Sequence, residues 1–509
     1  MSSRVPVPAR YQLGPLERRG ILGLLRPGQA ALTLASMLGG SAAVTATRSG
    51  AGLVLASAIL SGGLALAFLP IHQGRTADEI VPAVLGYLRR HGRRRDLYRS
   101  AAAETGFTLD GPAPSFALPA EIGRVDFLQV PYGRGTLGVL ADRQARTYLA
   151  VIACAAQSFV LLDEADKAAR LAGFAEVAKA LARQRSAVRR LQVMEMVVPG
   201  DRQALQRHFD VHQDPAAPAE ALASYQDLIG GTRTVAGEHR VYVVAALDPG
   251  RASRAIRSYG GRNVDVGATA VLAREVRALI RRLERASIEV REALSPRALA
   301  ALVACAYDPD RRPQVAKRIH VGADFEGVDP RSAWPGRAGP EHPDHYRHAG
   351  VVSTTYWVAE WPRVPVHGEF LAPLLVSSNV LRTFSLVYEG VPATKAMRQA
   401  TFAKTSDLAD DALRQKLGFL NTARRRNQLQ AVERREQELA DGHVDVRYTA
   451  WITVTARDPE ELEVRREEVE ELASQCRLEL QVATCEQARA FTFGALPLAR
   501  GLKRAGALT

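Results

Sequence analysis

Three evenly spaced histidines are the first residues of this 509-residue chain whose types could do chemistry. His342, His345 and His348 occur at intervals of three residues, and imidazole is a common ligand of Zn²⁺. However, nearby proline and glycine argue against a rigid helix, and no cysteine or glutamate is placed to complete a tetrahedral set. We therefore predict no metal site here and interpret the segment as a polar surface loop.

The lysines are few enough to test one by one for a nucleotide-binding loop. A P-loop needs a Gly-Lys pair, so that backbone amides and an ammonium group can hold phosphate. The chain has seven lysines, and none of them follows a glycine. The nucleophile elbow G-x-S-x-G, the zinc-protease motif H-E-x-x-H and a strand followed by G-x-G-x-x-G are missing from the sequence as well. We therefore predict no catalytic residue and no cofactor, and we do not expect an enzyme.

The four cysteines do not form a redox or metal motif. Cys154, Cys305, Cys476 and Cys485 are far apart or separated by more than the two residues of a C-x-x-C pair, and each has apolar or helical surroundings. This usage is typical of buried free thiols in a reducing compartment.

Two long uncharged stretches lie near the N-terminus and precede the rest of the chain. They cover about residues 29–47 and 51–70, with Arg48 alone between them and Pro70 at the end. An α-helix rises ~1.5 Å per residue, so ~20 residues cross the ~30 Å hydrocarbon layer of a membrane. The pattern predicts a transmembrane helical hairpin. The alternative is a buried, alanine-rich helical hairpin of a soluble protein.

Arginines flank this hairpin on both sides. Residues 1–100 contain 13 Arg, no Lys and 4 acidic residues, a net charge of +9 out of +13 for the whole chain. Because basic flanks stay on the cytoplasmic side, we expect a two-pass protein of the inner (plasma) membrane with both termini in the cytoplasm. Membrane lipid is the expected partner of the basic residues after the hairpin, which we predict to face the headgroups: Arg89, Arg90, Arg93, Arg94 and Arg95.

The rest of the chain predicts an α+β fold. A strand–helix–strand order occurs near residues 187–247, 351–391 and 444–483, which fits ferredoxin-like βαβ modules on antiparallel sheets. A charged helix from about 394 to 439 is expected to be an exposed arm. We divide the chain into a hairpin region with basic flanks (1–98), a linker (99–122), a first α+β module (123–306), a long loop (307–349), a second α+β module (350–500) and a tail (501–509).

One predicted helix has a strongly basic face. Between Ala268 and about Arg285, aliphatic residues recur on one side, and we place four arginines on the other: Arg274, Arg277, Arg281 and Arg282. We interpret the arginines as a solvated surface. Contact with nucleic acid is the sharper alternative, but no aromatic residue interleaves the arginines as stacking on bases would require.

Two parts of the chain resemble components of conjugative type IV secretion systems. Residues 1–98 are similar to the small PrgI-type inner-membrane subunit, through a VPVP lead, the hairpin and the helix start Gly74-Arg-Thr-Ala-Asp-Glu79. Residues 123–500 resemble the non-motor N-terminal half of the large secretion ATPase. The matching features of that half are Phe159 to Leu181, the charged helix 410–440, the strand and helix of 446–475, and Gln487 to Leu498. The preference for arginine over lysine is typical of a GC-rich genome, such as that of an actinobacterium.

The resemblance implies an anchor without a motor. In that family the Leu-Pro stretch leads into a nucleotide-binding motor whose motifs are missing here, so the chain would hold a separate P-loop motor ATPase at the cytoplasmic face, within an oligomeric secretion complex. Phe491, Phe493, Leu496 and Pro497 would be candidate contacts for that partner. Three alternatives stay open: a type VII secretion component of the EccE kind, a membrane-tethered nucleic-acid-binding protein, and an enzyme with an unrecognised site.

Overall fold

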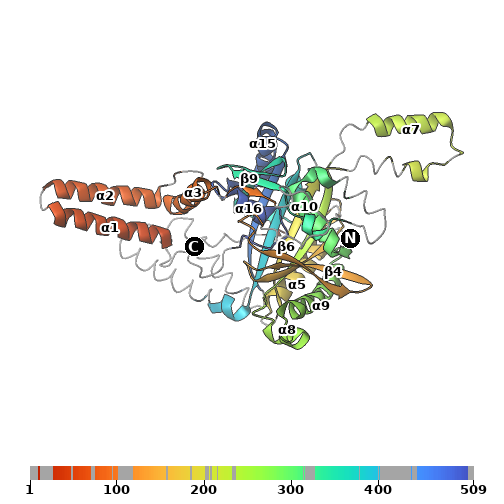
Figure 1. Ribbon diagram of the computed structural model, residues 1–509, viewed down its shortest axis with the longest axis horizontal. Coiled ribbons are helices and arrows are strands. Elements are labelled where there is room, and N and C mark those ends of the chain that lie inside the picture. The colour runs from red at the N-terminus through yellow and green to blue at the C-terminus, as the bar shows by residue number, and fades with distance from the viewer. Residues whose placement is uncertain are drawn as a thin grey trace, which may run out of the picture.

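The structure, a computed structural model, consists of a helical hairpin that projects from a body built on a β-sheet (Figure 1). It describes residues 10–11, 27–47, 50–69, 71, 75–94, 96–100, 118–155, 159–183, 186–200, 206, 209–214, 216–231, 237–312, 315, 327–377, 379–398, 401, 437 and 444–502.

The hairpin consists of α1 (Pro27–Thr47) and α2 (Gly50–Phe68), in agreement with the two predicted helices. Both are long and apolar enough to cross a membrane, by length and composition. The helices approach closely because Gly63 faces Ser36: a Cβ at Gly63 would lie 1.7 Å from the Ser36 hydroxyl. At the end nearest the body, the Gln29 side-chain amide donates to the carbonyl oxygen of Ala67 at 3.0 Å. These contacts hold α1 and α2 together as one unit.

The body is organised around one antiparallel sheet of 13 strands. Its order is β2-β9-β10-β11-β14-β13-β6-β7-β5-β4-β3, with β15 paired to β11 and β8 paired to β5. A separate short sheet pairs β1 (Arg10–Tyr11) with β12 (Val366–His367). The strands of the large sheet, in its order, are β2 (Tyr98–Arg99), β9 (Arg337–Glu341), β10 (Tyr346–His348), β11 (Val351–Glu360), β14 (Asp445–Ala456), β13 (Arg382–Val391), β6 (Val188–Val198), β7 (Glu238–Leu247), β5 (Thr147–Cys154), β4 (Gly135–Asp142) and β3 (Val125–Tyr132), then β15 (Glu479–Val482) and β8 (Val290–Ala293).

The predicted α+β class and the two N-terminal apolar helices are confirmed, but ferredoxin-like modules are not. Strands β6 and β13 pair from Arg190 with Glu389 to Val197 with Arg382. This pairing merges the strands of both expected modules into one sheet. Local sequence patterns carry no information on that contact, because its two strands are almost 200 residues apart.

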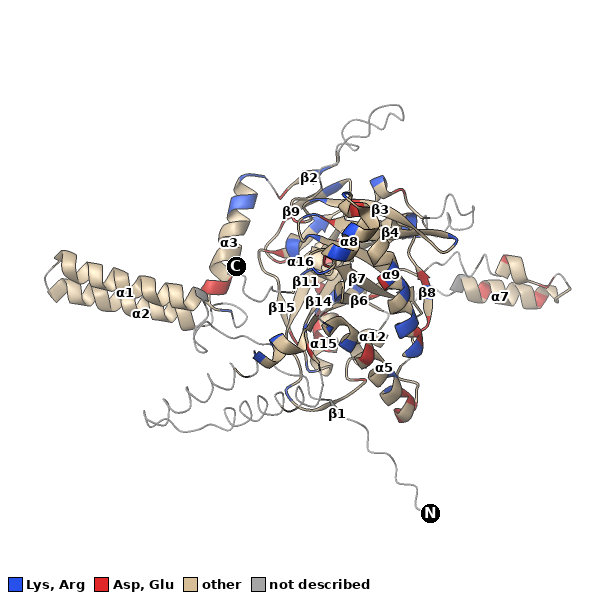
Figure 2. Ribbon diagram, turned by 90° about the horizontal axis from the view of Figure 1, so that it is seen from below, with Lys and Arg blue, Asp and Glu red and all other residues tan. Residues whose placement is uncertain are grey.

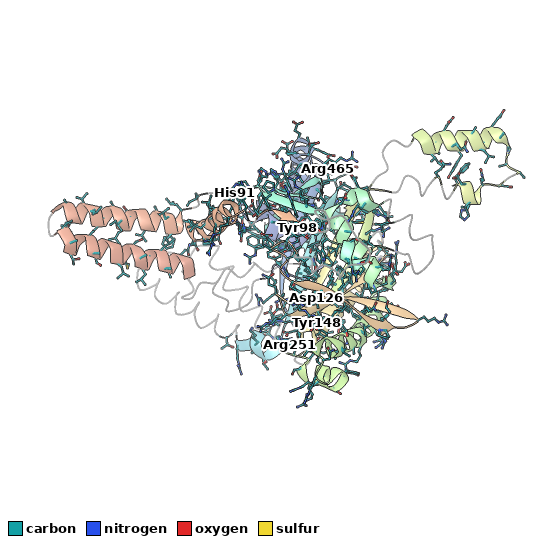
Figure 3. The ribbon with its side chains drawn as sticks, in the orientation of Figure 1. His91, Tyr98, Asp126, Tyr148, Arg251 and Arg465 are labelled. Atoms are coloured by element: carbon teal, nitrogen blue, oxygen red, sulfur yellow. The ribbon has the colours of Figure 1, made fainter. Side chains whose placement is uncertain are left out.

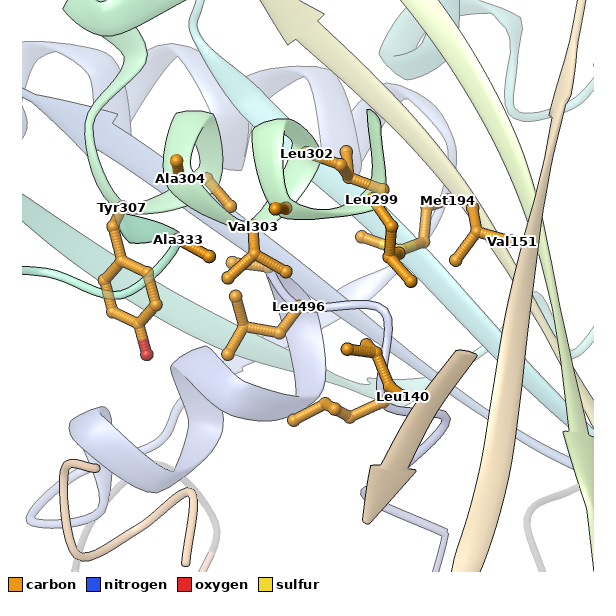
Figure 4. Close-up of a cluster of buried hydrophobic side chains, with 14 of the residues drawn as sticks. Leu140, Val151, Met194, Leu299, Leu302, Val303, Ala304, Tyr307, Ala333 and Leu496 are labelled. Atoms are coloured by element: carbon orange, nitrogen blue, oxygen red, sulfur yellow. The ribbon is translucent and has the colours of Figure 1, made fainter. Parts of the chain in front are cut away.

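Both faces of the central sheet are buried, as strand β5 illustrates. Leu149 and Val151 pack into one core with Met194 of β6 and with α10 (Pro296–Tyr307) (Figure 4). The intervening Ala150 and Ile152 pack into a second core on the opposite face. Successive side chains of a strand point to opposite faces, so a sheet covered on both sides needs nearly continuous apolar strands.

The remaining helices cover these faces or extend away from them. The second core includes residues of α5 (Glu164–Ala182), α8 (Ser253–Gly260) and α9 (Val264–Arg285). A third core packs α15 (Pro459–Gln475) and α12 (Ala372–Val376) against the half of the sheet around β11, and α16 (Gln487–Gly494) contributes to the first core. Helix α7 (Ala219–Gly231) projects away from the body (Figure 1).

Several predicted segments differ from the structure or cannot be compared with it. The expected long loop 307–349 contains the 3-10 turns Pro309–Arg311 and Pro330–Ser332 and strands β9 and β10. The many glycines and prolines of this segment are typical of loops, which is why the sequence did not indicate the strands. The expected linker begins inside β2, which pairs with β9. Most of the charged helix 394–439 and residues 503–509 of the tail lie outside the described residues.

Candidate membrane-attachment site

Helix α3 (Ala77–Gly92) connects the hairpin to the body. In Figure 2 it lies at the inner end of the hairpin and runs across the direction of α1 and α2 rather than along it. A helix with that placement lies along the surface of any membrane that the hairpin crosses. Its side chains would therefore decide how the body meets such a membrane.

The outer side of α3 carries an apolar stripe. Val81, Leu85 and Leu88 follow one another at spacings of four and three residues, which places them on one face of the helix. Their exposed fractions are 49%, 61% and 56%, so none of the three is covered by the body. Large apolar side chains exposed together mark an interaction site. The neighbouring hairpin is also apolar on its outside, where Leu53 and Val54 are exposed.

The C-terminal end of α3 carries arginines, as predicted. Arg89, Arg93 and Arg94 are exposed, whereas Arg95 lies outside the described residues. Their contact with lipid headgroups stays a prediction. An amphipathic helix with apolar and arginine-rich faces is the usual form of a helix in the membrane interface.

Arg90 was expected to face lipid, but the structure directs it into the body. Its Nη2 atom donates to Glu341 Oε2 at 3.0 Å and to the carbonyl oxygen of Cys485 at 2.9 Å. The side chain of Glu341 is only 1% exposed. We correct the prediction for this residue: Arg90 links α3 to the sheet. Sequence reasoning missed the link because Glu341 is 251 residues away.

Glu341 joins three elements through one carboxylate. It ends β9, accepts from Arg90 of α3 through Oε2, and accepts from the backbone amide of Ala488 in α16 through Oε1 at 3.1 Å. Burial raises the pKa of Glu341, and Arg90 opposes that rise. The hydroxyl of Tyr87 also donates to the backbone carbonyl of Glu341, at 3.3 Å. The connection between α3 and the body is therefore a buried polar node and not a loose tether.

A second link lies just beyond the end of α3. His91 Nδ1 is 2.9 Å from Asp96 Oδ2, and the Asp96 side chain is buried. Tyr98, two residues later, pairs with Ala338 as β2 joins the sheet. Figure 3 shows this progression, with His91 where α3 meets the body and Tyr98 further into the body.

The residues predicted to contact a partner motor are in the core. Phe491 and Leu496 are each 1% exposed, Pro497 is buried and Phe493 is half-buried against Trp451, with 5.1 Å between ring centroids. Figure 4 shows Leu496 among the buried side chains of α10. These four apolar residues pack against other residues of this chain, so we no longer propose them as contacts for a partner.

The three histidines do not form a metal centre. The rings of His342 and His345 stack with centroids 4.2 Å apart, whereas His348 is buried and bonded to Tyr307 and Ser353. Within the described residues, no group of three or more His, Cys, Asp and Glu side chains could hold a metal ion. The predicted surface loop is wrong for His348, which lies inside strand β10. All four cysteines are free thiols, and only Cys305 is more than slightly exposed.

Comparisons with known proteins do not assign the chain to a family. No protein-family model matches the chain, and no curated protein is significantly similar to it. The resemblance to secretion components therefore rests on the sequence patterns alone. What the geometry itself offers is an apolar hairpin, an amphipathic helix across its end, and a buried node that fixes both to a large sheet.

Proposed function

We propose that this protein is a non-catalytic membrane anchor and scaffold of a conjugative, type IV secretion-like machine. The hairpin spans the inner membrane, α3 lies in its cytoplasmic interface, and the body docks a separate P-loop motor ATPase at the cytoplasmic face. The anchoring role in this proposal rests on the fact that the two sides of α3 have different surroundings. One side exposes an apolar stripe to the surroundings, while Arg90 on the other side is bonded to buried Glu341.

The apolar stripe of α3 and the Arg90–Glu341 contact would each support anchoring. Complete burial of one leucine in an apolar phase contributes about 1.5–3 kcal/mol, so insertion of Val81, Leu85 and Leu88 adds appreciably to the hold of the hairpin. The Arg90 node then fixes the angle between that interface and the sheet. A body held at one orientation above a membrane is suited to assembling a larger complex, because its docking surface needs no further ordering.

The secretion part of the proposal is supported by the sequence resemblance of residues 1–98 and 123–500. The orientation with both termini in the cytoplasm is supported by the arginines on both flanks. Because Phe491, Leu496 and Pro497 are buried, the docking surface for a motor has to lie elsewhere on the body.

The position of α3 can be tested with a spin label at Leu85→Cys in full-length protein reconstituted into lipid nanodiscs. The four native cysteines should not react with the label. Burial raises the pKa of Cys154 and of Cys305 to about 11, and it also raises the pKa values of Cys476 and Cys485. All four thiols therefore stay protonated and unreactive at neutral pH. We expect a label at Leu85 to be accessible to apolar oxygen and protected from a water-soluble nickel complex.

A matched control is Val464→Cys on α15, which is 65% exposed. Figure 3 labels neighbouring Arg465 well away from α3. There the water-soluble complex should have the greater access. If the two labels show the same preference for the water-soluble complex, α3 does not lie in the membrane.

The partner is tested by pull-down of tagged full-length protein from its native membrane in mild detergent, followed by mass spectrometry. Recovery of a P-loop ATPase with conjugation-type neighbours supports the proposal. Recovery of type VII secretion subunits would instead favour the EccE-like alternative. Recovery of the protein from the soluble fraction alone would contradict the anchoring role.

A further inference from the structure

The basic face predicted on one helix lies on α9, and the fold adds residues from two other elements. Arg274, Arg277 and Arg281 are exposed along one side of α9. The opposite side of this helix, which includes Val276 and Leu283, is buried in the second core. Helix α8 precedes α9 and packs against it, whereas Arg282, also predicted on the basic face, is only half-exposed. Figure 2 shows the basic positions of both helices.

Two tyrosines from distant parts of the chain lie beside these arginines. The guanidinium carbon of Arg277 is 5.0 Å from the ring centre of Tyr132, which ends β3. That of Arg274 is 6.0 Å from the ring centre of Tyr259 on α8, and Tyr259 is 55% exposed. These are cation–π contacts, and they hold planar cations and aromatic rings on one surface. No aromatic residue interleaves the arginines within α9, as its sequence shows, but the fold brings two tyrosines from other elements beside them.

Most of these cations form no ion pair. Arg274 pairs with Glu275 at 2.8 Å, but within the described ranges no carboxylate forms an ion pair with Arg277 or Arg281, although Glu284 lies one turn after Arg281 and close to Tyr132. Positive charges gathered on one surface repel one another and attract polyanions from solution. Binding of a polyanion would relieve that repulsion.

We propose that the arginine–tyrosine face, formed by Arg274, Arg277, Arg281, Tyr132 and Tyr259, binds single-stranded nucleic acid. The arginines contact phosphates, and the exposed ring of Tyr259 and the flat guanidinium groups offer surfaces on which bases stack. Such a site tolerates many sequences, because phosphate contacts and stacking do not read base edges.

The surroundings of the face favour this ligand over other polyanions. The hairpin and α3 lie on one side of the body, and α8 and α9 do not reach that side in either view, so the face is not at the membrane surface (Figures 1 and 2). An intact duplex keeps its bases stacked on one another, which leaves the tyrosines without a role. An acidic peptide would use the arginines but not the exposed ring of Tyr259.

The test is fluorescence anisotropy of a labelled 20-residue oligothymidylate with full-length protein in phosphatidylcholine nanodiscs, across a series of salt concentrations. Each phosphate contact contributes about 0.7 to the slope of log affinity against log salt on a single strand. The triple variant Arg274→Gln, Arg277→Gln, Arg281→Gln should reduce the steepness of that slope by about 2. The flank arginines near the hairpin remain in every variant, so their contribution cancels in the comparison.

A matched control removes three charges elsewhere. Arg337→Gln, Arg347→Gln and Arg477→Gln change exposed residues on β9, on β10 and just before β15, which all belong to the half of the sheet around β11. This triple should keep the wild-type slope. Equal losses of slope in the two triples would overturn the proposal, because binding would then follow total charge and not this face.

The stacking component has its own variant, Tyr259→Leu. Loss of one stacked base should weaken oligothymidylate binding about fivefold or more, while competition by inorganic polyphosphate, which has no rings, should be unchanged. The proposal fails if oligothymidylate does not bind at about 50 mM salt, or if Tyr259→Leu leaves its affinity unaltered. It fails as well if polyglutamate displaces the oligonucleotide as effectively as unlabelled oligothymidylate does.

Discussion

At the scale of single residues, His348 shows how a candidate metal ligand can be part of the core. A carbonyl oxygen only accepts hydrogen bonds, so Nδ1 carries the proton and donates to the Tyr307 carbonyl at 2.7 Å. Nε2 then accepts from the Ser353 hydroxyl at 2.8 Å. The ring also packs against Phe491, with 4.4 Å between centroids. Both nitrogens are satisfied in the neutral form, which leaves no lone pair for a metal.

The neutral state of His348 predicts a pH dependence of stability. Burial lowers its pKa to about 4, from 6.5 for an unperturbed histidine. As pH falls from 6.5 to 4, the unfolded chain binds a proton that the folded chain does not, so the free energy of unfolding decreases. This residue alone should account for a loss on the order of 3 kcal/mol over that range. His348→Gln keeps a donor and an acceptor but does not titrate, and urea unfolding at several pH values should show a flatter dependence.

The control for this experiment is His367→Gln, which removes an exposed histidine of β12. That variant should keep the wild-type dependence on pH. An unchanged dependence in His348→Gln would mean that the buried ring does not control acid stability.

At the scale of elements, the junction of α3 with the sheet depends on one charged pair. Arg90→Met would leave the Glu341 carboxylate, which is 1% exposed, without its cation. Removal of one partner of a buried ion pair costs about 3–5 kcal/mol, and because Arg90 is itself 28% exposed we expect a value at the lower end of this range. Glu341, whose pKa burial already raises, would then favour its protonated form more strongly, so the cost should be larger at pH 8 than at pH 5. Hydrogen exchange should report faster opening of β9 and of the start of α16.

Arg89→Met is the matched control for the junction. It removes the neighbouring arginine, which is exposed and has no ion pair within the described ranges. Its free energy of unfolding and its exchange at β9 should equal those of the wild type. Equal effects of the two substitutions would show that overall charge, and not the pair, holds α3 in place.

Elements with strong local signals could be predicted from the sequence. The side chains of Asp163 and Asp458 cap α5 and α15, which is a local signal that a sequence displays, and the aliphatic side of α9 is buried as predicted. Contacts between distant segments could not be predicted, since neither the pairing of β6 with β13 nor the Arg90–Glu341 bond leaves a local pattern. The apolar run from Phe491 to Pro497 was ambiguous for another reason: burial in a core and contact with a partner select the same residue types.

At the scale of the whole molecule, the segment after α16 closes the body. Gln192, on the central strand β6, donates to the Leu496 carbonyl at 3.0 Å and accepts from the Ala499 amide at 2.7 Å. Arg500 then reaches β4, where its Nε donates to Asp142 Oδ2 at 2.6 Å. The segment thus connects the central strand β6 with β4, which is next to the edge strand β3. Removal of it should affect the entire body and not only its edge.

Two truncations test this closure. A chain that ends at Leu502 keeps Leu496, Leu498 and Arg500 and should retain the wild-type elution volume and protease resistance in detergent. A chain that ends at Phe493 exposes the first core and removes the bonds of Gln192 to Leu496 and Ala499 and of Asp142 to Arg500. Each lost leucine costs about 2–5 kcal/mol, and folded domains are stable by only about 5–15 kcal/mol, so this shorter chain should aggregate or be digested. Gln192→Leu in the full chain should give a milder version of the same defect, with a free energy of unfolding lower by about 2–4 kcal/mol. The control is Gln129→Leu, which changes an exposed side chain of β3 and should have little effect. A protease-resistant chain ending at Phe493 would show that the segment lies on the body without holding it together.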